Sequence, residues 1–194
     1  WPANRQGRIV ADTILGIRKN AYKGSLGTSI LKAFDLTVSA TGLNEKTLKR
    51  NNIPYMVTTV NRNSHASYYP GATPLTLKLI FNKEGDILGA QAIGYKGVDK
   101  RIDIISTAIK GNLKVWDLQE VEVAYAPPYN SAKDPVNIAG YAAENMINGE
   151  HESFRYFEIE ELWKDSNYQL LDIRTNSEFN LGTIKDSLHI DLDT

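Results

Sequence analysis

Apolar residues recur at helical spacing in several stretches of this chain, and two of these stretches carry helix-start signals. Pro2 suits a first helical turn because its missing N–H would be unpaired there. Asp134 followed by Pro135 has the form of a helix cap and a first-turn proline. The spacing of apolar residues predicts helices over residues 1–20, 44–51, 98–109 and 135–147.

Between these helices, β-branched and aromatic residues cluster or alternate with polar ones, as they do in strands. Leu75, Leu77 and Leu79 alternate with polar residues, and after the turn residues 83–86 the chain returns over residues 87–93 as the other arm of a hairpin. The patterns predict strands over residues 28–39, 55–60, 75–81, 87–93 and 121–125. The expected fold class is therefore α+β, an antiparallel β-sheet with helices on one side.

The pattern changes after residue 150. Residues 148–153 are polar and indicate a linker, and two short apolar strands are then predicted at 170–174 and 188–192. Strands separated by a helical segment are typical of a parallel α/β unit, so we expect a partial α/β segment there. The chain is accordingly divided into residues 1–22, 23–150 and 151–194. It starts without Met on helix-like residues and stops just after a strand-like segment, so we expect a piece of a longer protein.

Composition excludes several classes of function. With 22 basic and 23 acidic side chains the formal net charge is −1, which gives no basic excess for nucleic acid. No apolar run approaches the roughly 20 residues that span a bilayer, so no membrane partner is expected. There is no cysteine, which excludes a disulfide scaffold and a thiol nucleophile, and a cytoplasmic location is the default expectation.

Charged side chains and histidines give no further site. His65, His151 and His189 lack metal-ligand spacing, so no metal site is expected. Lys100, Arg101 and Asp103 are expected to form surface ion pairs of little individual value.

Four ordered motifs carry a resemblance to a known family. Residues 2–8, 65–71, 97–103 and 125–137 resemble segments of pyridine nucleotide-disulfide oxidoreductases of the coenzyme A-disulfide reductase and NADH oxidase type. The resemblance implies that residues 1–22 are the last helix of an FAD-binding domain and that residues 23–150 are the C-terminal dimerisation domain.

Residues 171–190 are similar to the opening of a rhodanese domain, through Asp172, Arg174 and the residues that follow them. Rhodaneses place their catalytic cysteine on a later loop, which this chain does not reach, so Asp172 and Arg174 are interpreted as structural.

The resemblance implies a flavoenzyme in which electrons pass from NAD(P)H to FAD and then to a cysteine that pairs with coenzyme A. Neither the cysteine nor a G-x-G-x-x-G fingerprint lies in this chain, where Gly24 and Gly27 are more simply turn residues. The segment is therefore expected to be inactive alone and to hold no cofactor. Its expected partners are a second copy, as a homodimer, and coenzyme A disulfide or a persulfide as substrate of the longer enzyme.

The same resemblance implies that Tyr68 and Tyr125 reach across the dimer to the partner's active site. A phenol is rigid and donates a hydrogen bond at its tip, so it could stabilise a leaving thiolate. The alternative is that they are ordinary core or interface tyrosines, since the chain has 10. Tyr69 and Tyr129 are the rivals within each motif.

Two substrate- or cofactor-binding residues are also implied. Lys133, at a helix entrance, matches a substrate-binding lysine and would contact phosphate, and its alternative is a solvated surface lysine. Asn4 matches a position that contacts substrate or flavin, and its alternative is a polar residue of the first helical turn. Arg5 and Arg8 would lie one turn apart and could help neutralise an anionic cofactor.

Three other functions have to be distinguished from this one. The same domain could come from an NADH oxidase, because the choice between oxidase and reductase depends on residues outside the chain. The chain could instead be a freestanding coenzyme A-binding module. A sulfurtransferase is excluded because persulfide transfer needs a cysteine.

Overall fold

The computed structural model describes residues 1–164 and 167–192. The predicted segment 151–194 therefore includes four residues that lie outside the described ranges. By its internal contacts the chain divides into two compact units, Trp1–Glu152 and Ser153–Thr194. Each unit is described by itself below.

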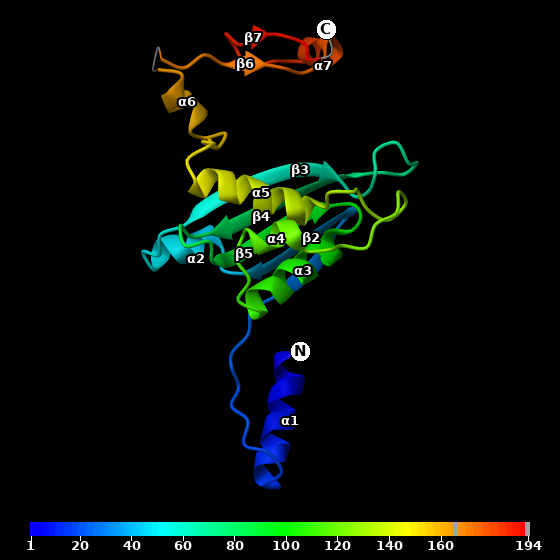
Figure 1. The fold of residues 1–194 in the computed structure, drawn as a ribbon, viewed down its shortest axis with the longest axis vertical. Helices are drawn as coiled ribbons and strands as arrows, with labels where there is room; N and C mark the ends of the chain where they lie inside the picture. Colours follow the sequence, from blue (N-terminus) through cyan, green and yellow to red (C-terminus); the bar gives the residue numbers. More distant parts are fainter. Residues whose placement is uncertain (165–166, 193–194) are drawn as a thin grey trace. The chain divides into compact units, whose positions relative to one another are not determined.

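The first unit is built on a five-stranded sheet in which every neighbouring pair of strands is antiparallel (Figure 1). The order across the sheet is β1-β2-β5-β4-β3, so the last strand in sequence lies in the middle. The predicted hairpin is confirmed as β4 and β5, which pair from Leu75↔Gly94 to Phe81↔Ile87. The strands are β1 (Ser29–Ala33), β2 (Leu36–Gly42), β3 (Met56–Asn63), β4 (Pro74–Phe81) and β5 (Ile87–Gly94).

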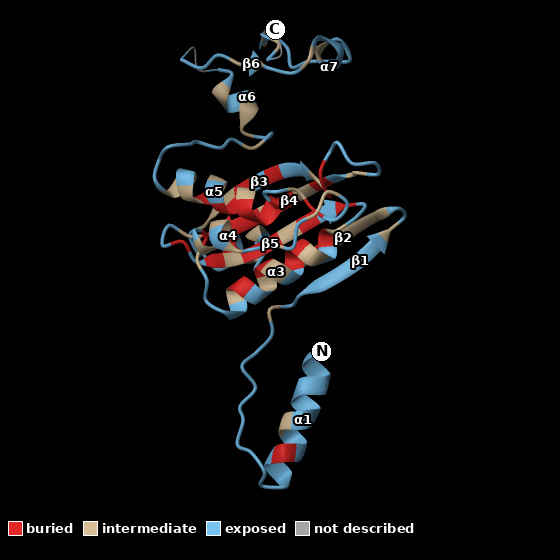
Figure 2. Ribbon diagram, turned by 45° about the vertical axis from the view of Figure 1, so that its right-hand side comes forward, coloured by how far each residue is buried: buried red, intermediate tan, exposed pale blue. Residues whose placement is uncertain are grey.

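Helices cover one face of this sheet, as the predicted α+β class requires (Figure 1). Helix α3 (Val98–Lys110) packs on β5 and β2, and α5 (Pro135–Ile147) packs on β3 and β4, with α4 (Asp117–Glu120) against α5. The core lies between the two layers, where the buried residues concentrate (Figure 2). It includes alternate residues of β4 because successive side chains of a strand point to opposite faces.

The start of the helix predicted over residues 44–51 and the cap predicted at Asp134 are confirmed. The Asn44 side chain accepts a hydrogen bond from Thr47 N at 2.9 Å and starts α2 (Glu45–Arg50). Asp134 caps α5 by accepting from Val136 N at 2.9 Å, while Asn137 Oδ1 accepts from Asp134 N at 2.9 Å. This reciprocal capping box pairs backbone N–H groups that the first helical turn would otherwise leave free.

Three predicted elements are wrong in extent or kind. The first helix, α1 (Pro2–Ile14), ends before Asn20 because Gly16 adopts a left-handed conformation with φ +66°. The strand predicted over 28–39 is two strands joined by a tight turn, where Phe34 has φ 51°. The segment 121–125 is not a strand. Its first carbonyl, that of Val121, accepts a hydrogen bond from the Asn137 side chain instead of from a neighbouring strand.

The second unit contains a small parallel pair of strands, β6 (Leu171–Asp172) and β7 (Leu188–His189), with α7 (Asn176–Asn180) between them in sequence. This is the predicted α/β order, but both strands are shorter than the predicted segments 170–174 and 188–192. It also contains α6 (Ile159–Leu162).

The charged pair of the second unit ties β6 to the loop that follows α7. Arg174 Nη2 lies 2.6 Å from Asp172 Oδ2 and donates to Gly182 O at 2.8 Å. Thr183 donates to the Asp172 carboxylate at 2.9 Å, and these bonds, that of Arg174 first, hold the pKa of Asp172 well below its ordinary value. Both side chains thus make local structural contacts.

Within the described ranges, no helix combines the length and the apolar character needed to cross a membrane.

Candidate functional site

Two loops at one end of the sheet carry the motif tyrosines. Loop 64–73 connects β3 to β4, and loop 121–134 connects α4 to α5. The amide of Ala66 donates to the carbonyl of Asn130 at 3.0 Å, which joins the two loops directly. Residues far apart in sequence therefore form one surface.

Tyr68 and Tyr125 meet on this surface. Their hydroxyl oxygens are 3.3 Å apart, and the side chains are 75% and 49% exposed. The tyrosines therefore do not lie in the hydrophobic interior, which excludes the core part of the alternative and not the part in which they are ordinary interface residues. The hydrogen bond to Tyr125 raises the pKa of Tyr68 above its ordinary value, at which a phenol is already protonated at neutral pH.

The two rival tyrosines have other surroundings. The Tyr69 ring packs edge-on against His65, with 6.0 Å between ring centroids. Tyr129 is 75% exposed, and its amide donates to Ala126 O at 2.8 Å in the turn that follows Tyr125. The hydroxyl contact therefore separates Tyr68 and Tyr125 from their neighbours, which the sequence could not do.

Two hydrogen bonds between Ser64 and Thr73, one to a side chain and one between backbone groups, close loop 64–73 at its base. Ser64 Oγ accepts from Thr73 N at 3.1 Å, and Ser64 N donates to Thr73 O at 2.8 Å. His65 is buried, with Nδ1 3.2 Å from Ser64 Oγ and Nε2 3.4 Å from Pro70 O. His65 therefore contributes hydrogen bonds to the shape of the loop.

Buried polar side chains hold loop 121–134. Asn137 Nδ2 donates to Leu118 O at 2.8 Å and to Val121 O at 3.0 Å, which fixes the beginning of the loop. The Asn130 side-chain oxygen accepts from Ser131 N at 2.9 Å near its end. Asn130 and Asn137 are buried, at 1% and 8% exposure.

Arg101 is not the surface residue that the sequence predicted. It is 1% exposed and forms an ion pair with buried Asp134, with 3.0 Å between Nη2 and Oδ2. A sequence signal existed: Arg101 falls on the same helical face as Val98, Ile102 and Ile105, which are all buried. A charged residue within an apolar stripe is expected to have a buried partner.

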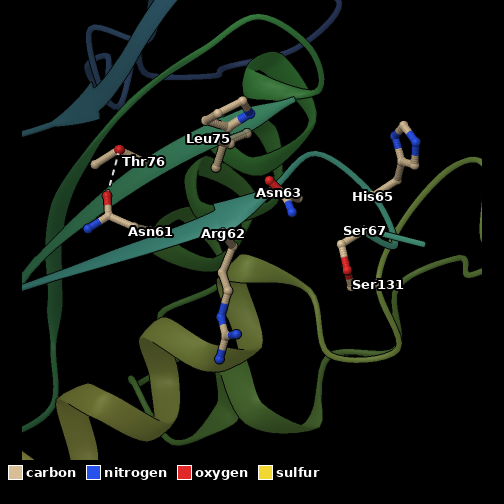
Figure 3. Close-up of a pocket in the computed structure, with 9 residues that line it drawn as sticks. Asn61, Arg62, Asn63, His65, Ser67, Leu75, Thr76 and Ser131 are labelled. Carbon is tan, nitrogen blue, oxygen red and sulfur yellow. Dashed lines mark hydrogen bonds between the residues drawn. The ribbon is translucent and has the colours of Figure 1, made fainter. Parts of the chain in front are cut away.

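A pocket of about 380 Å³ lies beside the base of the two loops (Figure 3). Strands β3 and β4 form its floor, where Thr76 donates to Asn61 Oδ1 at 2.7 Å. Most of its lining side chains are polar, and Arg62 is its one cation among the described residues. The lining consists of Asn61, Arg62, Asn63, His65, Ser67, Pro74, Leu75, Thr76 and Ser131.

Lys133, the predicted substrate contact in loop 121–134, has acidic surroundings. Lys133 lines a groove that also contains Glu120 and Glu122, and its ammonium lies 5.5 Å from the centre of the Tyr141 ring. An anionic ligand would meet the carboxylates of Glu120 and Glu122 there as well as one cation, and the third carboxylate of the groove, that of Asp134, is already paired with Arg101.

Asn4 is an exposed residue of α1. On the same helix, Arg8 Nε lies 3.2 Å from Asp12 Oδ1, so its charge is already paired within the helix.

No group of three or more metal-ligating residues occurs in the part of the chain that the structure describes. Gly24 and Gly27 both have left-handed φ angles and precede β1, as turn glycines do. The groups that this surface offers for chemistry are the two hydrogen-bonded phenols of Tyr68 and Tyr125.

Residues 28–135 match the family described as pyridine nucleotide-disulphide oxidoreductase, dimerisation domain. This chain belongs to that family. The dimerisation domain includes both tyrosine loops and buried Arg101. The prediction of this domain from the sequence motifs is thus confirmed.

Known relatives of the dimerisation domain include disulfide-reducing enzymes. Coenzyme A disulfide reductase from Staphylococcus epidermidis is 43% identical over 145 residues, which are 74% of this chain and 33% of that protein. The crystal structure of reduced Bacillus anthracis CoADR-RHD is 57% identical with a TM-score of 0.92, covering 100% of this chain and 35% of the other. A NAD-dependent persulfide reductase from A. fulgidus is 34% identical with a TM-score of 0.87, covering 98% and 34%. The chain thus spans about a third of the length of these relatives.

Proposed function

We propose that this chain is the dimerisation part of a flavin-dependent reductase of coenzyme A disulfide or of a persulfide. In that enzyme, Tyr68 and Tyr125 complete the active site of a second subunit. The observation that carries the proposal is the 3.3 Å contact between two exposed phenol oxygens from loops that a buried network joins.

The chemistry of the pair suits the reduction of a disulfide. When a disulfide is reduced, a thiolate leaves, and a phenol that donates a hydrogen bond to the sulfur lowers the free energy of that anion. Because Tyr68 keeps its proton at neutral pH, it can hold the Tyr125 hydroxyl in place without adding charge. The two hydroxyls thus supply one oriented donor toward an approaching sulfur.

The electron carriers would belong to the rest of the enzyme. When bound there, FAD and NAD(P)H supply the electrons, and a cysteine outside this sequence accepts them. The glycines of this chain do not fit a dinucleotide fingerprint. We also propose Lys133 and Asn4 as contacts for substrate or cofactor. The acidic neighbours of Lys133 should weaken its attraction for an anionic ligand.

We extend the proposal to the second unit, as the beginning of a rhodanese-like segment without its cysteine. Its support is the β6–α7–β7 order and the likeness to CoADR-RHD over the whole chain. A cytoplasmic location stays an expectation that rests on the absence of cysteine.

The deciding experiment is Tyr125→Phe in the longer flavoenzyme that contains this chain. We expect kcat with coenzyme A disulfide to fall on the order of 10- to 100-fold, since removing one donor from an anion-stabilising site costs up to about 10³-fold. Dimerisation should persist because the hydroxyl is exposed. Tyr129→Phe, in the same loop, is the matched control and should leave kcat unchanged. Unchanged kinetics in Tyr125→Phe would remove the catalytic role.

Two measurements on the present chain separate the proposal from a freestanding coenzyme A-binding module. Light scattering should give the mass of a dimer at micromolar concentration, since this class of domain provides the contact between subunits. Calorimetric titration with coenzyme A should give no binding heat. A monomer that binds coenzyme A would favour the binding module instead.

A further inference from the structure

Arg101 places a charged side chain inside the core of the dimerisation domain. It belongs to the buried face of α3, between Val98 and Ile105, and only 1% of it is exposed. Removing a guanidinium from water is costly, and a buried ion pair is weak evidence of stabilisation. The residue therefore needs an explanation beyond the stability of the fold.

The guanidinium of Arg101 contacts the base of both tyrosine loops at once. Nη2 donates to the carbonyl of Ser64 at 3.0 Å, where loop 64–73 begins, and to Asn130 Oδ1 at 2.8 Å, in loop 121–134. Nε donates to Asp134 Oδ1 at 3.4 Å, and Nη1 donates to Gly97 O at 3.0 Å. One planar side chain thus bridges three separate segments of the chain.

Short routes lead from these contacts to the two phenols. Asn130 accepts, through its carbonyl, the amide of Ala66, two residues before Tyr68. The Asn130 amide donates to Ala126 O at 3.1 Å, and Ala126 follows Tyr125 directly. Each tyrosine is therefore one or two residues from a residue whose backbone is hydrogen-bonded to Asn130. Arg101 in turn donates a hydrogen bond to the side chain of Asn130.

We propose that Arg101 is a positioning residue that fixes the two loops relative to each other, so that the hydroxyls of Tyr68 and Tyr125 stay within hydrogen-bond distance. Its catalytic consequence rests on the function proposed above, whereas its effect on loop geometry does not. Only arginine offers five donors in a rigid fork, and a lysine ammonium at the same place could not reach all of these acceptors. A displacement of about 1 Å at a reacting group can cost about 100-fold in rate.

The geometric part is tested on this chain with 3-fluorotyrosine and ¹⁹F NMR, with resonances assigned through Tyr68→Phe and Tyr125→Phe. Arg101→Lys keeps the positive charge beside Asp134 but loses the planar guanidinium with its several donors. It should shift the ¹⁹F resonances of both Tyr68 and Tyr125. Asn130→Ala removes one acceptor, leaves the ion pair in place and should give shifts in the same direction. Ile105→Ala, also buried on α3, is the control for lost stability and should leave both resonances in place.

The catalytic part is tested in the longer flavoenzyme. Arg101→Lys should lower kcat on the order of 10- to 100-fold with a smaller effect on KM, and Ile105→Ala should not. In a Tyr68→Phe/Tyr125→Phe background, Arg101→Lys should cause no further loss, because its effect passes through those hydroxyls.

Unshifted resonances in both Arg101→Lys and Asn130→Ala would overturn the positioning role. So would an equal loss of kcat with and without the tyrosine hydroxyls, since Arg101 would then act by another route. If the resonances shift but Tyr125→Phe keeps full activity, the positioning of the loops stands and the proposed function fails. The two proposals can thus fail separately.

Discussion

Replacing Asn137 by Asp removes the side-chain donors that hold the beginning of loop 121–134 and changes little else. Asn137 lies in the first turn of α5, is 8% exposed, and donates to the carbonyls of Leu118 and Val121 at 2.8 and 3.0 Å. The two side chains have nearly the same shape, so no cavity forms. The oxygen that accepts from Asp134 N at 2.9 Å is also retained.

The expected cost comes from the buried carbonyl of Leu118 and the partly buried carbonyl of Val121, which lose their donor, and from a carboxylate that faces them. One unsatisfied buried acceptor costs about 1–3 kcal/mol, and burial of the charge adds to this. We predict that Asn137→Asp lowers the free energy of unfolding by about 3 kcal/mol at pH 7. For a chain of this size, that corresponds to a fall in Tm of about 10 °C.

The loss should depend on pH in a defined direction. Burial and the facing carbonyls should raise the pKa of the introduced carboxyl in the folded state above about 3.9, its value in the unfolded chain. The folded state then holds its proton more tightly, so stability declines as pH rises from about 4 through the folded-state pKa. The deficit relative to the unmodified chain should therefore be smaller at pH 5 than at pH 7.

Urea unfolding followed by circular dichroism at pH 5 and pH 7 measures both effects. The matched control is Asn145→Asp, on the exposed side of the same helix, which should change stability by no more than about 0.5 kcal/mol. Equal losses in the two variants, or a loss for Asn137→Asp that does not vary with pH, would refute the assignment of Asn137 as a buried donor.

Three further outcomes are expected. Gly89→Ala should destabilise the sheet by about 2 kcal/mol or more in urea unfolding, because a Cβ there would lie 2.2 Å from the backbone oxygen of Leu43, which cannot move aside cheaply. Lys114→Met should return the pKa of Asp86, now lowered first by its hydrogen bond to Lys114, toward the ordinary value in an NMR titration. The lowered pKa of Asp86 stabilises the fold above about pH 4, and this contribution is lost as pH falls through the lowered pKa. Lys114→Met should reduce that contribution, and the hydrogen bond from Asn82 should keep the remainder. In the longer enzyme, Lys133→Met should raise KM for coenzyme A disulfide several-fold while Lys133→Arg does not, and equal KM values would end its proposed role as a phosphate contact.

Much of the fold could be predicted from local pattern. The β4–β5 hairpin follows from alternation before the turn residues 83–86 and from the mainly apolar segment after them, and the start of α5 follows from Asp134 and Pro135. These features depend on neighbours within a few residues. The strand predicted at 121–125 failed because a strand needs a partner, and the Val121 carbonyl accepts a hydrogen bond from the Asn137 side chain instead.

The motifs at residues 65–71 and 125–137 indicated the family, and each of them contains two tyrosines. The sequence by itself could not decide which tyrosine in each motif meets the other. The hydroxyl contact of Tyr68 and Tyr125 joins positions 57 residues apart, and it exists only once the two loops are brought to the same end of the sheet.

The sequence by itself determined the antiparallel hairpin, the helix caps, the family and the absence of a thiol. The tertiary structure decided that Arg101 lies in the interior and not on the surface. Its acceptors in Ser64, Asn130 and Asp134 are 29 to 37 residues away, so no local pattern contains them. A buried charge is tolerated only where folding gathers its partners around it, and that requirement is met by packing rather than by neighbouring sequence.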